Sequence, residues 1–203
     1  MSSLKINFRI LCNAVAASIL LGACVCFSAC SSHTAKTPVV QDKDLVIPDL
    51  PSAKEQFGYA VTYQRSQVLS TTPERRKSQF DKMILCFERV IRNFPQDEAH
   101  TPLAKLSVAD CVANKGDWQT AIKSYQRIAQ EYAGTEFVRA RAEFSIAKAY
   151  DWTGKYSEAK NGYRDFISQY EKSQNASVQE MVKQAKLEYF QAREEKPKRL
   201  VKK

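Results

Sequence analysis

The feature that most constrains the fold of this chain is an internal repeat. The segment GDWQTAIKSYQRIAQEYAGT, which begins at Gly116, aligns with GKYSEAKNGYRDFISQYEKS, which begins at Gly154, at a spacing of 38 residues. The other aligned positions pair small, aromatic or apolar side chains: Trp118 with Tyr156, Ala121 with Ala159, Tyr125 with Tyr163, Ile128 with Phe166, Tyr132 with Tyr170 and, upstream, Ala109 with Ala147. Self-similarity at one fixed period is typical of stacked repeat units, each of which buries its apolar face against its neighbours.

Each repeat unit is predicted to be a pair of helices. Apolar residues recur at helical spacing, as in the segment 80–94, and no stretch shows the alternation that is typical of strands. Capping-box patterns at Ser52 and Ser177 and the Thr-Pro pairs at Thr72 and Thr101 mark helix starts. The predicted helices are 52–69, 73–94, 102–115, 118–132, 136–153, 156–170 and 178–194. The fold class is therefore all-α: an α-solenoid of about three helix pairs plus a C-terminal capping helix.

This repeat resembles the tetratricopeptide repeat (TPR). The segment AKAYDWTGKYSEAKNGYRDFISQY, from Ala147 to Tyr170, carries the alanine, glycine and aromatic positions of that family, at a period of 38 instead of the family's 34. In these positions alanine lets helices approach closely, glycine ends the first helix of each pair, and aromatic rings fill the space between pairs. The resemblance assigns such packing roles to Ala109, Gly116, Trp118, Ala121, Tyr125, Ala147, Tyr150, Gly154, Tyr156, Ala159 and Tyr163.

The resemblance also implies a binding groove, because the first helix of each TPR pair lines a groove that binds peptides or partner proteins. Carried over position by position, the groove contains Asn114, Arg141, Phe144, Lys148, Asp151 and Trp152. Trp152 beside Arg141 and Lys148 suits an acidic or aromatic peptide, or else it only covers the loop above the third pair. The Lys/Asn clamp with which some TPRs bind C-terminal carboxylates does not match, since the corresponding positions hold Asp110 and Lys148.

The first thirty residues predict export and lipid attachment. Two basic residues precede an apolar run over positions 10–27, which is the layout of a signal peptide. The motifs LGAC, ending at Cys24, and FSAC, ending at Cys30, both resemble the lipobox of bacterial lipoproteins, whose cysteine carries acyl chains such as palmitate. Cys24 is the preferred lipid-modified residue and Cys30 the alternative. A membrane-spanning anchor and an ordinary secretory signal are the competing interpretations.

These features divide the chain into four parts. They are a signal peptide over 1–23 (or 1–29 if Cys30 is acylated), a flexible tether over 24–51, a TPR-like helical domain over 52–195, and a basic disordered tail over 196–203. The tether contains three prolines and shows no helical period, and the tail holds five basic residues in eight positions.

No catalytic or metal-binding motif is apparent. The chain has two histidines, neither in a metal-ligand spacing, and it lacks a glycine-rich phosphate loop and a nucleophile motif. We therefore predict neither an enzyme nor a bound metal or cofactor. Cys86 and Cys111 fall on consecutive antiparallel helices, where they could form a disulfide in an oxidising compartment or stay as buried free thiols.

Lipobox, tether and repeats together resemble the TPR lipoproteins of the bacterial envelope, which include the BamD-type β-barrel assembly factors and the Tol-Pal-associated TPR proteins. The resemblance implies a non-catalytic adaptor, lipid-anchored to the inner or outer membrane, that binds a protein or peptide in the envelope. The alternatives are a cell-wall-associated structural protein that binds anionic polymers through its basic surface, or an accessory subunit of an envelope enzyme. Nucleic acid is disfavoured as a partner because the chain is predicted to be exported.

Overall fold

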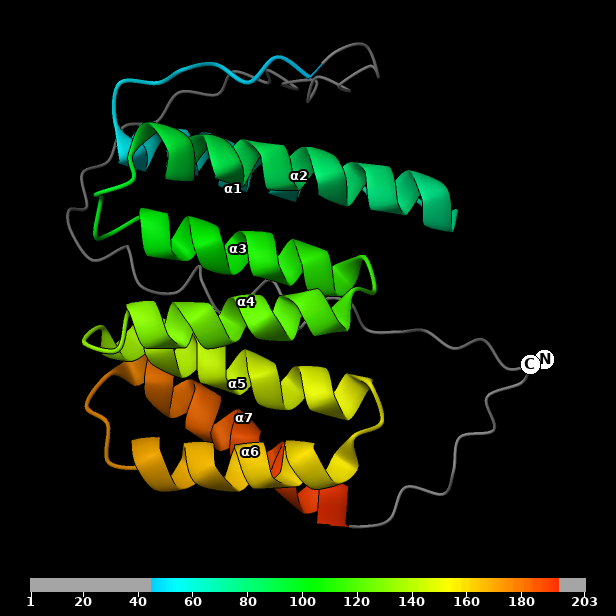
Figure 1. Ribbon diagram of the computed structural model, residues 1–203, viewed down its shortest axis with the longest axis vertical. Helices are drawn as coiled ribbons and strands as arrows, with labels where there is room; N and C mark the ends of the chain where they lie inside the picture. Colours follow the sequence, from blue (N-terminus) through cyan, green and yellow to red (C-terminus); the bar gives the residue numbers. More distant parts are fainter. Residues whose placement is uncertain (1–44, 194–203) are drawn as a thin grey trace, which may run out of the picture. The chain divides into compact units, whose positions relative to one another are not determined.

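The structure is a computed structural model that describes residues 45–193 (Figure 1). This part of the chain forms seven helices and contains no strand: α1 (Ala53–Ser66), α2 (Pro73–Asn93), α3 (Thr101–Asn114), α4 (Trp118–Glu131), α5 (Glu136–Trp152), α6 (Tyr156–Tyr170) and α7 (Ala176–Arg193). Each helix packs against the next one in the sequence, α3 also contacts α5, and α5 also contacts α7. The predicted all-α helical-repeat fold is confirmed. The predicted signal peptide, Cys24, Cys30 and the tail over 196–203 lie outside the described residues.

The predicted helices agree with the observed ones to within three residues at each end. The closing helix differs at its start, because its cap is Asn175 and not the predicted Ser177. The Asn175 Oδ1 accepts hydrogen bonds from the backbone N–H groups of Ser177 and Val178, at 3.0 and 3.3 Å. This side chain satisfies two amide groups that a helix start leaves without a partner, so α7 begins at Ala176.

Two glycines make the tight turns inside the second and third helix pairs. Gly116 follows α3 with φ of +95°, and Gly154 follows α5 with φ of +76°. After α3 the N–H of Asp117 donates to the carbonyl of Val112, and after α5 the N–H of Lys155 donates to the carbonyl of Tyr150. This pattern is the Schellman motif, which requires a left-handed residue at the glycine position. Each turn therefore sends the chain back antiparallel after three residues.

Three apolar clusters form the core. The first lies between α1, α2 and α3, the second between α3, α4 and α5, and the third between α5, α6 and α7. Six of the residues assigned to repeat packing are buried in these clusters: Ala109, Ala121, Tyr125, Ala147, Ala159 and Tyr163. Trp118 and Tyr150 pack at the cluster edges. Tyr156 differs from its assigned role, since 45% of it is exposed at the start of α6, where no further helix pair covers it.

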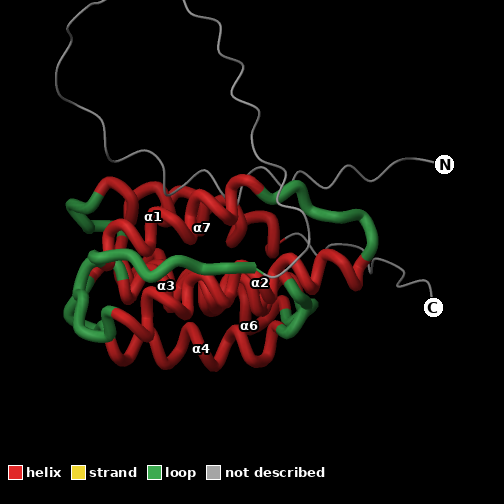
Figure 2. Tube along the Cα trace, turned by 90° about the horizontal axis from the view of Figure 1, so that it is seen from above, coloured by secondary structure: helices red, strands yellow, loops and turns green. Residues whose placement is uncertain are grey.

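The end of the predicted tether is not free but packs on the first helix pair. Residues 45–50 lie extended across α1 and α2 (Figure 2). The side chain of Gln56, which is fully buried, accepts a hydrogen bond from the N–H of Leu50 at 3.0 Å and donates one to the carbonyl of Pro48 at 3.1 Å. One glutamine amide thus replaces the hydrogen bonds that a neighbouring strand would supply to this segment.

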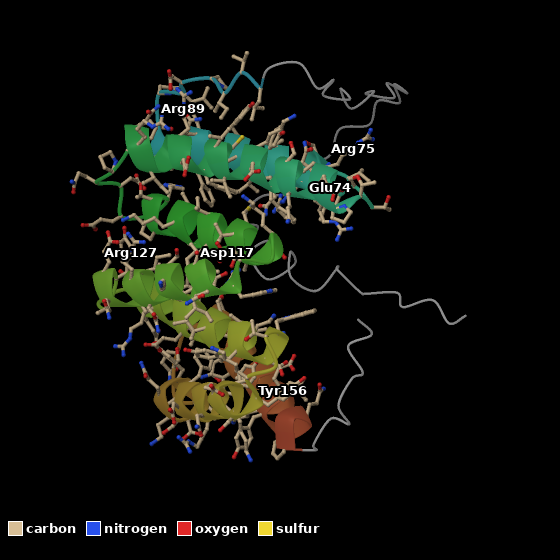
Figure 3. All side chains as sticks on the ribbon, turned by 45° about the vertical axis from the view of Figure 1, so that its right-hand side comes forward. Glu74, Arg75, Arg89, Asp117, Arg127 and Tyr156 are labelled. Atoms are coloured by element: carbon tan, nitrogen blue, oxygen red, sulfur yellow. The ribbon has the colours of Figure 1, made fainter. Side chains whose placement is uncertain are left out.

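A charged contact and two apolar side chains hold the same segment. The Oδ1 of Asp49 accepts hydrogen bonds from Arg89 at 2.7 Å and from Asn93 at 2.8 Å, both near the C-terminal end of α2 (Figure 3 labels Arg89). These bonds lower the pKa of Asp49. Leu45 and Ile47 pack against the first cluster. The segment therefore covers apolar surface at the end of the helix stack, as terminal caps of repeat proteins do.

Candidate protein-binding face

The first helices of the second and third pairs, α3 and α5, meet on one side of the stack and are joined there by α7. Charged side chains of the three helices approach one another on this side: Asp110 from α3, Arg141 and Lys148 from α5, and Glu188 from α7. We call these four residues the α3–α5–α7 face.

An ion pair joins α3 to α5 on this face. Arg141 Nη2 lies 2.7 Å from Asp110 Oδ2, and the two side chains are only 17% and 22% exposed. The hydroxyl of Tyr125 on α4 donates a hydrogen bond of 2.6 Å to the other carboxylate oxygen of Asp110. Burial raises the pKa of Tyr125 well above its ordinary value, and the negative charge of Asp110 raises it further. Tyr125 is therefore a neutral donor, and the charge of Arg141 is balanced inside the protein.

Lys148 lies about two turns beyond Arg141 along α5 and has a different environment. Its Nζ lies 5.5 Å from the centre of the Phe144 ring. Within the described part of the chain Lys148 forms no ion pair. Burial lowers its pKa, the carboxylate of Glu188 opposes this effect, and Arg141 adds to it. A carboxylate supplied by another molecule would stabilise this ammonium group, because burial has already removed part of its hydration.

Trp152 lies at the C-terminal end of α5, beside the turn to α6. Its ring stacks on the ring of Trp118 at the start of α4, with 6.0 Å between centroids and 4° between planes. Trp152 remains 59% exposed. The stack places one ring face against the neighbouring helix pair and leaves the remainder of the ring in solvent.

Comparison with known proteins identifies the repeat. Residues 105–135 and residues 141–173 each match the family model of the tetratricopeptide repeat. These two segments are therefore similar to tetratricopeptide repeats. The first match covers most of α3 and all of α4, and the second covers most of α5 and all of α6. No curated protein matches the chain. TPRs are in general non-catalytic modules that bind protein partners.

The six residues predicted to line a TPR groove have different surroundings in the structure. Arg141 and Lys148 belong to the α3–α5–α7 face, with Asp151 acting on Lys148 electrostatically. Asn114 bonds to the backbone carbonyl of Asp110 one turn earlier in α3, at 2.8 Å. The other two are placed differently from the prediction, as follows.

Phe144 is a core residue and Trp152 belongs to the turn. Phe144 is 4% exposed and packs against the rings of Tyr163 and Phe166, so its ring is not presented to a partner. Side chains at this position of α5 point between the helix pairs, which the alignment alone did not reveal. The ring of Trp152 contacts Trp118 of the neighbouring helix pair, and it is still accessible to solvent.

The structure does not contain the disulfide that Cys86 and Cys111 could form. Neither cysteine forms a disulfide, and both are buried in the first cluster. Burial raises the pKa of the Cys86 thiol to about 11, which keeps it protonated and poorly reactive at neutral pH. Both residues act as small apolar core side chains.

Residues 45–193 contain no group of three histidine, cysteine or acidic side chains that could hold a metal ion. The same residues contain no helix that is both long and apolar enough to cross a membrane. The ring of His100 lies 3.0 Å from Asp97, whose carboxylate also accepts the backbone N–H of His100 at 2.6 Å, so this pair forms a loop cap before α3.

Proposed function

We propose that this protein is a non-catalytic adaptor that binds an acidic segment of a partner protein on the α3–α5–α7 face. The observation that carries this proposal is Lys148, a partly buried cation without an ion-pair partner among the described residues, on the side where the first TPR helices meet. A carboxylate placed there would replace lost hydration with a charged hydrogen bond. Arg141 is unsuited to this task because Asp110 already neutralises it.

Site-specific photo-crosslinking tests the adaptor role in cells. A photoreactive residue replaces Asn114, at the C-terminal end of α3, and a control replaces Arg127, which is exposed on α4 (Figure 3). We expect one protein partner to be captured from position 114 and not from position 127. Capture of cell-wall polymer without any protein would refute the adaptor and favour the cell-wall alternative.

Lys148→Gln then tests the chemistry of the contact. We expect this variant to bind the captured partner at least tenfold more weakly, since a charged hydrogen bond contributes about 1.5–3 kcal/mol. Lys123→Gln is the control, because Lys123 is an exposed lysine on α4. Equal binding by both variants would remove Lys148 from the site.

We further propose that the adaptor is exported and attached to a bacterial envelope membrane through an acylated cysteine. The support is the apolar run followed by LGAC and FSAC in the sequence, with Cys24 preferred and Cys30 as the alternative. Mass measurement of the N-terminal peptide of the membrane-isolated protein tests this idea. A peptide beginning at Cys24 or Cys30 with acyl chains supports it, and an intact N-terminus without acyl chains refutes it.

A further inference from the structure

The extended segment of residues 45–50, which we call the strap, contacts the first helix pair in the way that a bound peptide contacts its receptor. Its main chain is hydrogen-bonded to two side chains of α1. The amide of Gln56 both accepts and donates a bond, and the hydroxyl of Tyr59 donates one to the carbonyl of Val46 at 3.4 Å. Bonds of this kind require an extended backbone and place no demand on the side chains that it carries.

Alternate side chains of the strap face the helices. Leu45 and Ile47 pack against the first cluster, whereas Val46 between them is 80% exposed. Pro48 favours the extended conformation of the residue before it, and it has no N–H group that would need a partner. The first helix pair therefore accepts apolar side chains at two alternate positions, followed by a proline.

An acidic side chain is recognised at the next position. The Oδ1 atom of Asp49 lies 2.7 Å from Arg89 Nη1 and 2.8 Å from Asn93 Nδ2, both on α2. The Asp49 side chain is 68% exposed, so this contact contributes little to the stability of the fold. Two donors that converge on one oxygen still distinguish a carboxylate from an apolar or a basic side chain. The pattern that fits the site is thus apolar, any residue, apolar, proline, acidic.

The strap can be exchanged because each of its contacts is weak. The ion pair is exposed, and both apolar side chains are only partly buried. An empty site is unfavourable, since Gln56 is completely buried while the strap is in place and its amide would lose both partners. Displacement by a segment of the same pattern preserves these bonds, whereas simple opening does not.

The strap of a second copy is a poor replacement. Ser52 caps α1, and its hydroxyl accepts a hydrogen bond from the N–H of Glu55 at 3.2 Å. Leu50 is two residues from Ser52, so at most about 7 Å of chain separates a bound strap from the helix that follows it. Helices are about 10 Å wide with their side chains, so the first helix of a second copy would compete with α1 for the same space. A segment of another protein has no such restriction.

We propose that the first helix pair is a peptide-binding site that holds the strap in the free protein and exchanges it for an extended segment of a partner protein with the same pattern. This proposal goes beyond the adaptor function at the α3–α5–α7 face and does not rest on it, because α1 and α2 form the site. The strap competes at an effective concentration on the order of millimolar, as a short intramolecular segment does. It therefore excludes unmatched segments and is displaced by matched ones.

Fluorescence anisotropy with the full chain tests the exchange. The probe is a labelled peptide LVIPDLP, which repeats residues 45–51. We expect half-saturation of the wild-type protein on the order of a millimolar, because the probe must displace the strap. A strap variant with Leu45→Gln, Ile47→Gln and Asp49→Ala leaves α1 and α2 unchanged, and it should bind the probe at least about tenfold more tightly. A peptide with the same residues in scrambled order is the control.

Asp49→Ala alone tests the exchange without uncovering the first cluster, because it leaves the apolar side chains of the strap in place. This variant should bind the probe about two- to fivefold more tightly than the wild-type protein does, which is the factor expected for the loss of one exposed ion pair from the strap. Probe binding equal to that of the wild-type protein would show that Asp49 does not hold the strap in the site.

Charge reversal tests the recognition of the acidic residue. Arg89→Glu, combined with the substitutions of the strap variant, should reverse the preference, so that a probe LVIPKLP binds about two- to fivefold better than LVIPDLP. Arg75→Glu, at the other end of α2, is the control and should keep the preference for LVIPDLP (Figure 3). A merely structural role of Arg89 would weaken the binding of both probes equally.

Hydrogen exchange reports on the strap in the wild-type protein. The N–H of Leu50, which is bonded to Gln56, should exchange faster when unlabelled LVIPDLP is added, since the displaced strap loses this bond. The N–H of Ser70, which is bonded to Gln79, should not change. Unchanged exchange at Leu50, or equal probe binding by the wild-type protein and the strap variant, would overturn the proposal, because the strap would then be a permanent cap. So would a dimer in sedimentation that the strap variant converts to a monomer, because the strap would then bind a second copy.

Discussion

Replacing Gln56 with leucine tests how the N-terminal segment is held on the helix stack. The substitution removes an acceptor for Leu50 N–H and a donor to Pro48 C=O, at 3.0 and 3.1 Å. Each hydrogen bond contributes about 0.5–1.5 kcal/mol net, so the two together contribute about 1–3 kcal/mol. Gln56 has no exposed surface, and water cannot easily replace the lost partners. We therefore expect a loss near the upper end, about 2–3 kcal/mol of unfolding free energy.

Gln79 provides a matched control for this prediction. It makes the same two kinds of bond to a loop, accepting from the N–H of Ser70 at 2.8 Å and donating to the carbonyl of Val68 at 2.9 Å. Its loop is more accessible to water, so Gln79→Leu should cost about 1 kcal/mol or less. Urea unfolding measures both values, and hydrogen exchange at Leu50 should accelerate only in the Gln56 variant. If the two variants lose equal stability, burial of the amide is not what holds residues 45–50.

Three further predictions concern the helix stack. Gly154→Ala should cost about 1–2 kcal/mol of unfolding free energy, because φ is +76° at this position. A steric clash does not contribute, since no atom lies within 4 Å of the added Cβ. Gly134→Ala is the control in thermal unfolding, because Gly134 does not have a positive φ. Tyr125→Phe should cost about 1.5–3 kcal/mol in urea unfolding, since it removes a hydrogen bond to the charged carboxylate of Asp110; no change would show that water replaces the hydroxyl. Lys148→Met should raise stability at pH 7. Because the pKa of Lys148 is lower in the folded state, the unfolded chain binds the proton more tightly. The stability of the wild-type protein therefore rises with pH up to about 10.5. If the Lys148→Met variant retains this rise, the rise does not come from Lys148.

Helices and turns could be predicted because the residues that determine them are close in the sequence. A Schellman turn needs a residue that tolerates positive φ. Gly116 and Gly154 indicate the positions of these turns, because they lie at fixed distances from the alanine and aromatic positions. The start of α7 was misplaced by two residues because Asn175 and Ser177 are both good caps. Local pattern cannot choose between two competing caps when the following helix can begin at either.

Contacts between distant segments could not be predicted. Nothing near Gln56 in the sequence indicates that its amide binds the main chain of residues 48–50, since a glutamine inside a helix is usually exposed. The prolines and the lack of a helical period predict a flexible tether. The same two features also fit a segment that packs on the helices in an extended form, so they do not distinguish the two cases. The pair of Asp110 and Arg141 likewise depends on the distance between α3 and α5, which a single sequence does not contain.

The first helices of the two repeats differ in length. α3 has 14 residues and α5 has 17, and both end at their glycine turn in the same way. The three residues at the start of α5, Glu136 to Val138, therefore have no counterpart in α3. Val138 is buried, and Phe137 contacts both the second and the third cluster, so this added turn contributes core contacts.

Equivalent positions of α3 and α5 are therefore found by counting back from Gly116 and Gly154, and not forward from the helix starts. At the spacing of 38 residues, Asp110, Lys148 and Lys186 are equivalent positions of α3, α5 and α7, so the charge at this position changes sign after α3. A partner that binds the face must match that change, with a carboxylate at α5 and none at α3, where Asp110 is already paired with Arg141. A uniformly acidic peptide would lose binding free energy at α3, which offsets part of the binding free energy that it gains at Lys148. The face therefore favours a partner with a single, well-placed carboxylate.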